Sequence, residues 1–271
     1  MNPENSLYQA ARACLLSDSV DEKMAMSGEI AEAWSRGELA LTGWTDAAEI
    51  TRAGHPKQPV LVHPSKLPRR RMGSEAGRLA LIHAIAHIEF NAVNLAWDAV
   101  QRFAGMPADF YTDWIQVAVE EVEHFQLLQA RLNAAGASYG DFPAHNGLWE
   151  MAQRTAHDPL VRMALVPRML EARGLDVTPG IMQRFREIED DQTVAALEVI
   201  LREEVGHVQF GSRWFNYLCQ QRGLPAEETY FDLLESFLNG EIRCPLHHQA
   251  RREAGFSQSE LERLEALCKR V

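Results

Sequence analysis

Glu204-Val205-Gly206-His207 repeats a pattern found earlier in the chain, Glu121-Val122-Glu123-His124. In a helix, residues three positions apart lie side by side on one face, so each Glu-x-x-His step directs a carboxylate and an imidazole the same way. Both steps stand in long segments whose apolar residues recur with the helical period. One copy alone would be a weak signal, because Glu and His are both common on solvated faces. The repetition is what makes the pattern informative.

Each copy is preceded by a further glutamate at nearly the same spacing. Glu89 lies 32 residues before Glu121, and Glu171 lies 33 residues before Glu204. Glu89 falls on an apolar stripe, where a carboxylate is unfavourable unless it is paired or bound to a metal. Each upstream glutamate and the Glu-x-x-His step that follows it form one half of the pattern. If the two lie on antiparallel helices of about 25 residues joined by a short turn, they reach the same level along the bundle axis. The predicted metal ligands are therefore Glu89, Glu121, His124, Glu171, Glu204 and His207.

The charge and donor types of this set indicate which metals it suits. Four carboxylates balance two divalent cations, so the buried cluster is neutral with metal and self-repelling without it. Oxygen-rich ligands with one imidazole per ion suit iron or manganese, whereas structural zinc sites use thiolates. We expect two iron ions, with manganese or a mixed Mn/Fe pair as the alternative. Glu121 and Glu204 would bridge the ions, Glu89 and Glu171 would be terminal ligands, and no catalytic residue beyond the metal centre is predicted.

Hydrophobic periodicity predicts an all-α bundle of four helices with a long crossover between the second and third. The third helix carries Pro167, which should kink it one turn before Glu171, and Gly174 should end it. Thr178 is then a plausible N-cap for a further segment that begins at Pro179. The predicted bundle helices cover residues 75–103, 108–135, 159–173 and 191–221.

Further segments flank the bundle on both sides. We expect helices over residues 6–16 and 19–36, and then a strap over residues 54–68 whose four prolines disfavour regular helix. The strap is expected to be extended, and β structure is expected only for a few residues near Pro59 to His63. The tail should form one or two short helices around Cys244-Pro245. The predicted divisions are 1–74 for the N-terminal helices and strap, 75–224 for the di-metal bundle, and 225–271 for the helical extension.

Composition limits the partners and the compartment. The net charge of −11 argues against a general nucleic-acid or anionic-membrane surface, although Arg69, Arg70 and Arg71 could form either a solvated helix entry or an anion-binding mouth. No basic region followed by an apolar core precedes Val20, and no apolar run approaches the roughly 20 residues that span a bilayer. We expect a cytoplasmic protein whose scattered cysteines are free thiols: Cys14, Cys219, Cys244 and Cys268.

Several other residues could carry chemistry, but packing roles are favoured for them. His83 and His87 have the i, i+4 spacing that can bind metal, yet they are rotated more than 100° from Glu89, at about 100° per residue, which favours a packed or solvated rear face. Core packing is favoured for Trp114. Surface or crossover packing is favoured over a redox role for Tyr111 and Tyr139, and no lid role is assigned to His145, His247 or His248.

The six-residue ligand pattern resembles the ferritin-like superfamily of di-iron carboxylate proteins. Three stretches are similar to the ferritin-like domain-of-unknown-function family numbered 455: Tyr139-Gly-Asp-Phe-Pro-Ala-His145, Leu170-Glu-Ala-Arg-Gly-Leu-Asp-Val-Thr-Pro179 and Glu203-Glu-Val-Gly-His207. The resemblance covers most of the chain from the strap to the tail. It implies a four-helix bundle with a di-metal centre and no settled activity.

The functional expectation is a di-metal oxidoreductase that activates dioxygen or peroxide on an unknown small-molecule substrate. An electron donor and a homodimeric assembly belong to this expectation. The alternatives are an iron-storage protein, a manganese catalase-like enzyme and a tRNA hydroxylase-like enzyme. The long segment before the bundle, the kink at Pro167 and the expected break after Glu171 argue against a storage shell. Nucleic acid is not expected as a partner, because only the cluster from Lys66 to Arg71 favours it.

Overall fold

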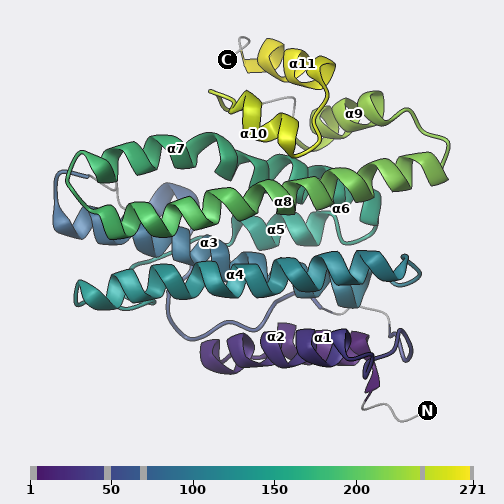
Figure 1. Ribbon diagram of the computed structural model, residues 1–271, viewed down its shortest axis with the longest axis horizontal. Helices are drawn as coiled ribbons and strands as arrows, with labels where there is room; N and C mark the ends of the chain where they lie inside the picture. The colour runs from purple at the N-terminus through teal and green to yellow at the C-terminus, as the bar shows by residue number, and fades with distance from the viewer. Residues whose placement is uncertain (1–4, 46–49, 68–71, 239–241, 269–271) are drawn as a thin grey trace. The chain divides into compact units, whose positions relative to one another are not determined.

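A computed structural model describes residues 5–45, 50–67, 72–238 and 242–268. Helices dominate these residues, and the only β pairing among them consists of two isolated bridges, Ser6 with Ala40 and Leu61 with Ala144 (Figure 1). The prediction of an all-α fold is therefore confirmed. The chain divides into two compact units, Met1–Gln153 and Arg154–Val271. The arginines at positions 69–71 lie outside the described residues.

The first unit is built on two long antiparallel helices, α3 (Glu75–Arg102) and α4 (Ala108–Ala134), joined by a turn at Gly105. Shorter helices α1 (Leu7–Leu16) and α2 (Val20–Ser35) pack on them (Figure 1). The observed bounds lie within one residue of the predicted ones. Side-chain caps explain this agreement, because the hydroxyls of Ser6, Ser19 and Ser74 accept hydrogen bonds from the first turns of α1, α2 and α3.

The described part of the strap, residues 54–67, lies along the crossover in the first unit. The Val62 N–H donates to Ala144 O, and the Ala144 N–H donates to Val60 O, at 2.8 and 3.1 Å. The residues expected to have β structure therefore form one isolated β-bridge, between Leu61 and Ala144. Only a short 3-10 turn interrupts the strap, η2 (Pro64–Lys66), and the crossover holds one short helix, α5 (Gly147–Arg154).

The second unit corrects the predicted third helix. It consists of α6 (Pro159–Leu165), a π-helical segment η3 (Val166–Glu171) and α7 (Ala172–Arg186). Pro167 thus opens a π-helix rather than a simple kink. The predicted stop at Gly174 and the predicted N-cap at Thr178 are wrong, because α7 runs through Pro179. Its buried face, which includes Leu175, Met182 and Phe185, outweighs the poor helix propensities of glycine and proline.

The helix α8 (Asp191–Gln221) runs beside α7 and matches its predicted bounds (Figure 1). It passes close to η3 at Gly211. A Cβ atom added there would lie 2.5 Å from both Cβ and Cγ of Pro167. The glycine is therefore required by the close approach of α8 to the π-helix.

The described part of the tail forms three helices, α9 (Ala226–Leu238), α10 (His248–Glu253) and α11 (Gln258–Cys268), rather than one or two. The buried Arg168 of η3 ties them to the rest of the unit. Its guanidinium pairs with Glu260 at 2.8 Å and lies 4.4 and 4.5 Å from the ring centres of Tyr230 and Phe256. Two tail helices and the loop before α11 thus pack on the segment that ends at Glu171.

The cysteines differ from the prediction in one pair. Cys244 and Cys268 form a disulfide, with their Cα atoms 5.9 Å apart. The chain of α10 and α11 folds back to bring the end of α11 to Cys244, which spacing in the sequence does not reveal. Cys14 and Cys219 are free, as expected, and both are buried.

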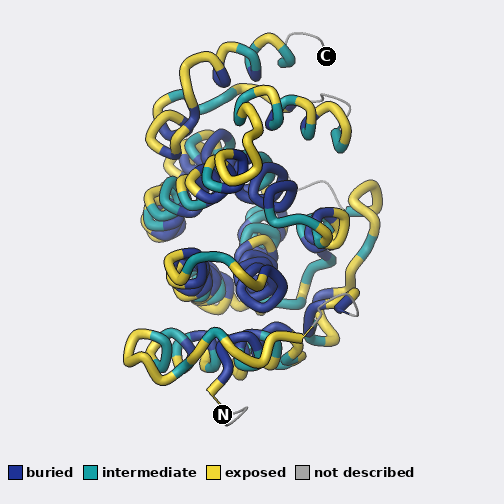
Figure 2. The backbone as a smooth tube through the Cα atoms, turned by 90° about the vertical axis from the view of Figure 1, so that its right-hand side faces the viewer, coloured by how far each residue is buried: buried dark blue, intermediate teal, exposed yellow. Residues whose placement is uncertain are grey.

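The helix α3 has the length and apolar composition of a membrane-spanning helix, contrary to the expectation that no segment approaches one. By length and composition this helix could cross a bilayer, but 72% of its apolar window is buried inside the chain. Figure 2 shows buried positions running along helices whose other faces are exposed. This burial is that of a core helix and favours a soluble protein.

We predict that Gly211→Ala destabilises the protein. The new Cβ overlaps Pro167, so η3 or α8 must shift, which should lower the free energy of unfolding by about 1–3 kcal/mol. Gly180→Ala is the matched control, because it lies inside α7 with open space around it and should be neutral or stabilising by up to about 1 kcal/mol. Urea unfolding measures both. Equal stabilities for the two variants would contradict the close packing.

We also predict a pH dependence from Lys23. Its buried ammonium donates to Cys14 O and Leu15 O, each at 2.8 Å, and burial lowers its pKa from 10.5 to about 8. Between pH 8 and 10.5 the unfolded chain holds this proton and the folded chain releases it. Because of Lys23, the free energy of unfolding therefore increases as pH rises from 8 to 10.5, by about 3 kcal/mol at most.

Lys23→Met should remove this gain. Urea unfolding of wild type and variant between pH 7 and 10.5 measures it as the difference between the two curves. Lys57→Met, on an exposed residue, is the control and should leave the wild-type curve unchanged. A Lys23→Met curve parallel to wild type would show that the buried lysine keeps an ordinary pKa.

Candidate metal centre

The first unit brings three of the predicted ligands together. Glu89 comes from α3, and Glu121 and His124 come from one face of α4; all three are buried. The His124 Nδ1 atom lies 3.2 Å from Glu121 Oε2 and 3.8 Å from Glu89 Oε2. Their potential ligand atoms lie within 4.8 Å of one another, so the group could hold a metal ion.

The second unit repeats the glutamate–histidine pairing. Glu204 and His207 lie one helical turn apart on α8, both are buried, and His207 Nδ1 lies 3.7 Å from Glu204 Oε2. Glu171 is also buried, at the end of η3. The structure thus buries every one of the six predicted residues. The six-residue ligand set as a whole stays a prediction.

The donor set fits a divalent metal ion of the predicted kind. Glu89 and Glu121 are two carboxylates held in a largely apolar interior around one imidazole. Two buried negative charges at this separation are unfavourable unless a cation or shared proton compensates them. Carboxylate oxygens with a single imidazole are donors that iron and manganese accept.

The position of Glu171 depends on the π-helix. A π-turn adds a residue to the helical register and so rotates every following side chain, and such turns occur frequently at functional sites. Arg168 fixes the turn through a hydrogen bond from its Nε to Ser212 Oγ at 3.1 Å and through its ion pair with Glu260. The Arg168 anchor was not identified from the sequence, because an isolated arginine between Pro167 and Glu171 carries no pattern.

A layer of aromatic and imidazole rings covers the other side of α3. His83 and His87 are both buried, which confirms the packed rear face. Tyr139 stacks on His83 with ring centres 5.3 Å apart, and its hydroxyl lies 2.8 Å from His87 Nδ1. Burial lowers the pKa of His87 to about 3, so this imidazole is neutral at pH 7. The other ring nitrogen, Nε2, lies 3.2 Å from His145 O and 3.0 Å from Asn91 Nδ2, so both sides of the ring are in polar contact.

This ring layer adjoins the metal-ligand group. The Tyr139 ring packs against Phe125, at 4.9 Å between centres, and against Phe90, at 5.6 Å. These two phenylalanines directly follow His124 and Glu89 in sequence. Tyr139 therefore has a packing role, as favoured, and supports both helices beside their ligands. Core packing is likewise confirmed for Trp114, which is buried. Tyr111 also packs in the core, as a fully buried residue of α4, rather than at the surface or in the crossover as predicted.

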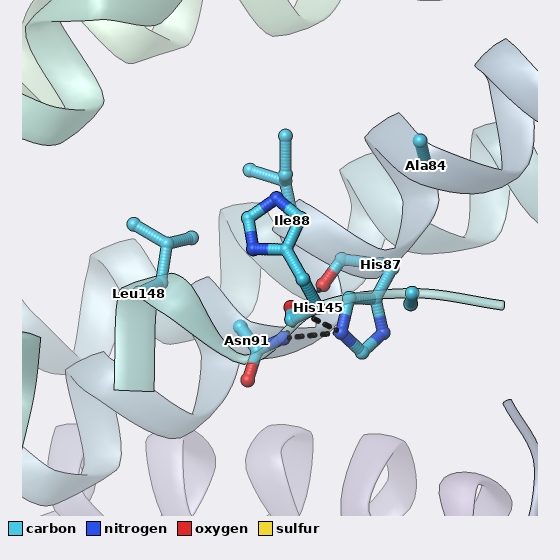
Figure 3. A pocket seen from close by; sticks show the side chains of 7 residues that line it. Ala84, His87, Ile88, Asn91, His145 and Leu148 are labelled. Atoms are coloured by element: carbon cyan, nitrogen blue, oxygen red, sulfur yellow. Dashed lines mark hydrogen bonds between the residues drawn. The ribbon is translucent and has the colours of Figure 1, made fainter. Parts of the chain in front are cut away.

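A small hollow opens beside the ring layer in the first unit. Figure 3 shows His87 and Asn91 of α3 facing the crossover residue His145, with Ile88 and Leu148 at the sides. The Asn91 amide contacts His87 Nε2 at 3.0 Å, and the His145 ring accepts a hydrogen bond from the Gly147 N–H. His145 thus orders the start of α5, and the other loop histidines are also in structural contacts: His247 caps α10, and His248 pairs with Glu265.

Comparison with known proteins places most of the chain in one group. Residues 16–262 match the model of a family described as "Protein of unknown function (DUF455)". A relative from Haemophilus influenzae, named "Uncharacterized protein", is 46% identical over 217 residues, which cover 78% of this chain and 75% of that protein. No solved structure matches the chain.

We predict that Glu121→Gln uncouples stability from metal. In protein treated with a chelator, the variant should be at least as stable as wild type, because one of two neighbouring buried charges is gone. Added Mn²⁺ or anaerobic Fe²⁺ should raise the melting temperature of wild type. At a metal concentration of 100 times Kd, binding adds about 2.7 kcal/mol to the free energy of unfolding. The melting temperature of the variant should rise much less. Differential scanning calorimetry measures both effects.

Glu123→Gln is the matched control, since it changes an exposed glutamate on the same helix. Its response to metal should equal that of wild type. A metal-induced shift of the same size in Glu121→Gln would remove Glu121 from the ligand set.

Proposed function

The chain belongs to the DUF455 family of proteins of unknown function, and we propose that it is a di-metal oxidoreductase built on a ferritin-like four-helix bundle. The observation that carries this proposal is the repeated, buried glutamate–histidine pair. Glu121 with His124 and Glu204 with His207 have the same spacing on long helices, and each pair is joined by a carboxylate–imidazole contact. A repeat of this kind, with an upstream buried glutamate in each half, supports two equivalent ligand sets.

In this proposal the two groups are the two halves of one ligand set, as the sequence repeat predicts. Glu89, Glu121 and His124 would serve one ion, and Glu171, Glu204 and His207 the other. Glu121 and Glu204 would bridge, since each stands beside a histidine that holds one ion. Four carboxylates neutralise two divalent cations, so metal binding also relieves the charge repulsion among these buried residues.

The proposed reaction is oxidation of a small organic substrate by dioxygen or peroxide. The bound ions, iron in the first place, would supply the redox electrons and the open coordination positions for this chemistry. The residues of the chain would hold these ions apart from bulk water. Phe90 and Phe125 are fully buried next to Glu89 and His124, and such apolar walls exclude solvent from the oxidising step.

The added helices favour an enzyme over a storage protein. In the first unit α1 and α2 cover α3 and α4, and in the second the tail packs on η3 through Arg168. The expected break after Glu171 no longer contributes to this argument, because α7 is continuous. A cytoplasmic location, an external electron donor and a homodimer belong to the same proposal, with no role for nucleic acid.

The proposal predicts two metal ions per chain, whose binding depends on the second pair. Protein purified without added metal, or loaded anaerobically with Fe²⁺, should contain two ions per chain by plasma mass spectrometry. Glu204→Ala with His207→Ala should contain fewer than two, because one ion loses its imidazole and a bridging carboxylate. After stopped-flow mixing with dioxygen, wild type should oxidise its ferrous ions much faster than the double variant does.

The matched control is Glu203→Ala with Gln209→Ala, which changes the same helix at less buried positions. It should keep two ions and the wild-type oxidation rate. Two ions in the Glu204/His207 variant would refute the ligand set, and ferrous ions that persist in oxygenated wild type would refute the oxidase. Oxygen evolution from peroxide by the manganese form would instead support the catalase alternative, and a many-subunit shell in size-exclusion chromatography would support storage.

A further inference from the structure

The disulfide of the second unit lies where solvent can reach it. Cys244 is an exposed residue of the chain between α9 and α10, and Cys268 is the half-buried last residue of α11. Figure 1 shows α11 as the outermost helix of this unit, beyond α10. Exposed disulfides are the ones that thiols attack readily, whereas well-buried structural ones resist reduction. The bond between Cys244 and Cys268 is therefore open to thiol–disulfide exchange.

The last turn of α11 has little else to hold it. The buried residues of this helix are Glu260, Leu261 and Leu264, and all three precede the last turn. In the last turn Glu265 pairs with His248 at 2.6 Å, but the two side chains are 46% and 32% exposed, and ion pairs as exposed as this one contribute little. A disulfide limits how far its two ends can separate when either segment opens. The bond thus fastens the end of α11 to the segment before α10.

The first turn of α11 carries the ion pair that supports the π-helix. Glu260 Oε1 accepts a hydrogen bond from Arg168 Nη2 at 2.8 Å, while Arg168 Nη1 has no hydrogen-bond partner in the described part of the chain. When α11 opens, Glu260 leaves Arg168, and a buried guanidinium without its carboxylate is strongly unfavourable. The π-helix η3 then loses the support of its central residue. Attachment of α11 and order in η3 are therefore coupled.

We propose that Cys244 and Cys268 form a redox-controlled clasp. In the oxidised form the clasp holds α11 on η3, and in the reduced form it releases the end of α11 and loosens η3. The reductant is a dithiol protein. The clasp uses none of the six predicted metal ligands, so its test needs no bound metal.

The redox step is an ordinary thiol–disulfide exchange. A thiolate of the reductant attacks Cys244 Sγ, and Cys268 leaves as a thiolate that takes up a proton. The second thiol of the reductant loses its proton, attacks the mixed disulfide and displaces Cys244, which is protonated in turn. Two electrons and two protons thus pass to the cysteine pair, and the reductant becomes a disulfide. The same exchange run backwards with a small-molecule disulfide closes the clasp.

A redox titration tests whether the bond responds to thiols. The purified full chain is equilibrated with glutathione and glutathione disulfide over a wide range of ratios, and also with a thioredoxin-type dithiol protein. Free thiols are then trapped and located by mass spectrometry. The pair of Cys244 and Cys268 should pass from bonded to reduced while circular dichroism shows a folded chain. A bond that persists at every ratio and with the dithiol protein until the chain unfolds would be a structural staple and would overturn the proposal.

Hydrogen exchange tests what the clasp holds. In the double variant Cys244→Ser with Cys268→Ser, amides of α11 and η3 should exchange about tenfold faster or more than in oxidised wild type, and amides of α4 should not change. Reduced wild type should match the double variant. Ala266→Ser, at an exposed position in the last turn of α11, is the matched control and should exchange as oxidised wild type does. Unchanged exchange in α11, or equally faster exchange throughout the chain, would contradict a local clasp.

Glu260→Gln tests the coupling to η3. It removes the charge beside Arg168 but keeps an oxygen that can accept from the Ser257 N–H, as Glu260 Oε2 does at 2.8 Å. In this variant η3 should exchange faster even when the bond is intact, and reduction should add nothing further in η3. Glu262→Gln, exposed on the same helix, should respond to reduction as wild type does. An equal effect of reduction on η3 in both variants would show that the ion pair does not carry the coupling.

Discussion

The burial of carboxylates beside histidines is the constraint on which the rest of the structure depends. Glu89 and Glu121 lie within a layer of apolar side chains, where an uncompensated charge costs several kcal/mol. Such a pair persists only if the surrounding helices are held together by burial elsewhere and if a cation or a shared proton offsets the repulsion. The long apolar faces of α3 and α4 supply the first condition. The donor set facing His124 meets the second when metal binds.

Capping residues and burial along apolar helix faces also explain how much of the structure could be predicted from the sequence. Long helices with capping residues were located closely: α8 begins after Asp190, whose side chain accepts from Thr193 N, and it ends before Gly223, which has a positive φ. All six candidate ligands are buried, since each stands at the apolar period of its helix or close to it. The continuity of α7 could not be predicted, because local propensity at Gly174 and Pro179 opposes helix and only packing of the buried face overrides it.

Features that depend on tertiary contact left no local signal. The Cys244–Cys268 bond requires α10 and α11 to fold back so that the end of α11 meets Cys244, and the stack of Tyr139 on His83 joins the crossover to α3. Spacing indicated correctly that His83 and His87 point away from Glu89. It gave no indication that this rear face would be lined by the crossover or that a pocket would remain beside Asn94. Loop conformation creates these sites, and helical period alone does not describe it.

The π-helix connects stability to the candidate centre. Its register places Glu171, yet π geometry is less favourable than α, so the segment needs external support. Arg168 provides that support at the expense of burying its own charge, which Glu260 and the rings of Tyr230 and Phe256 compensate. Ser212 and Gly211 supply the matching surface on α8. Because each of these contacts comes from a different part of the unit, the tail helices act as structural support for a ligand position and not as an independent appendage.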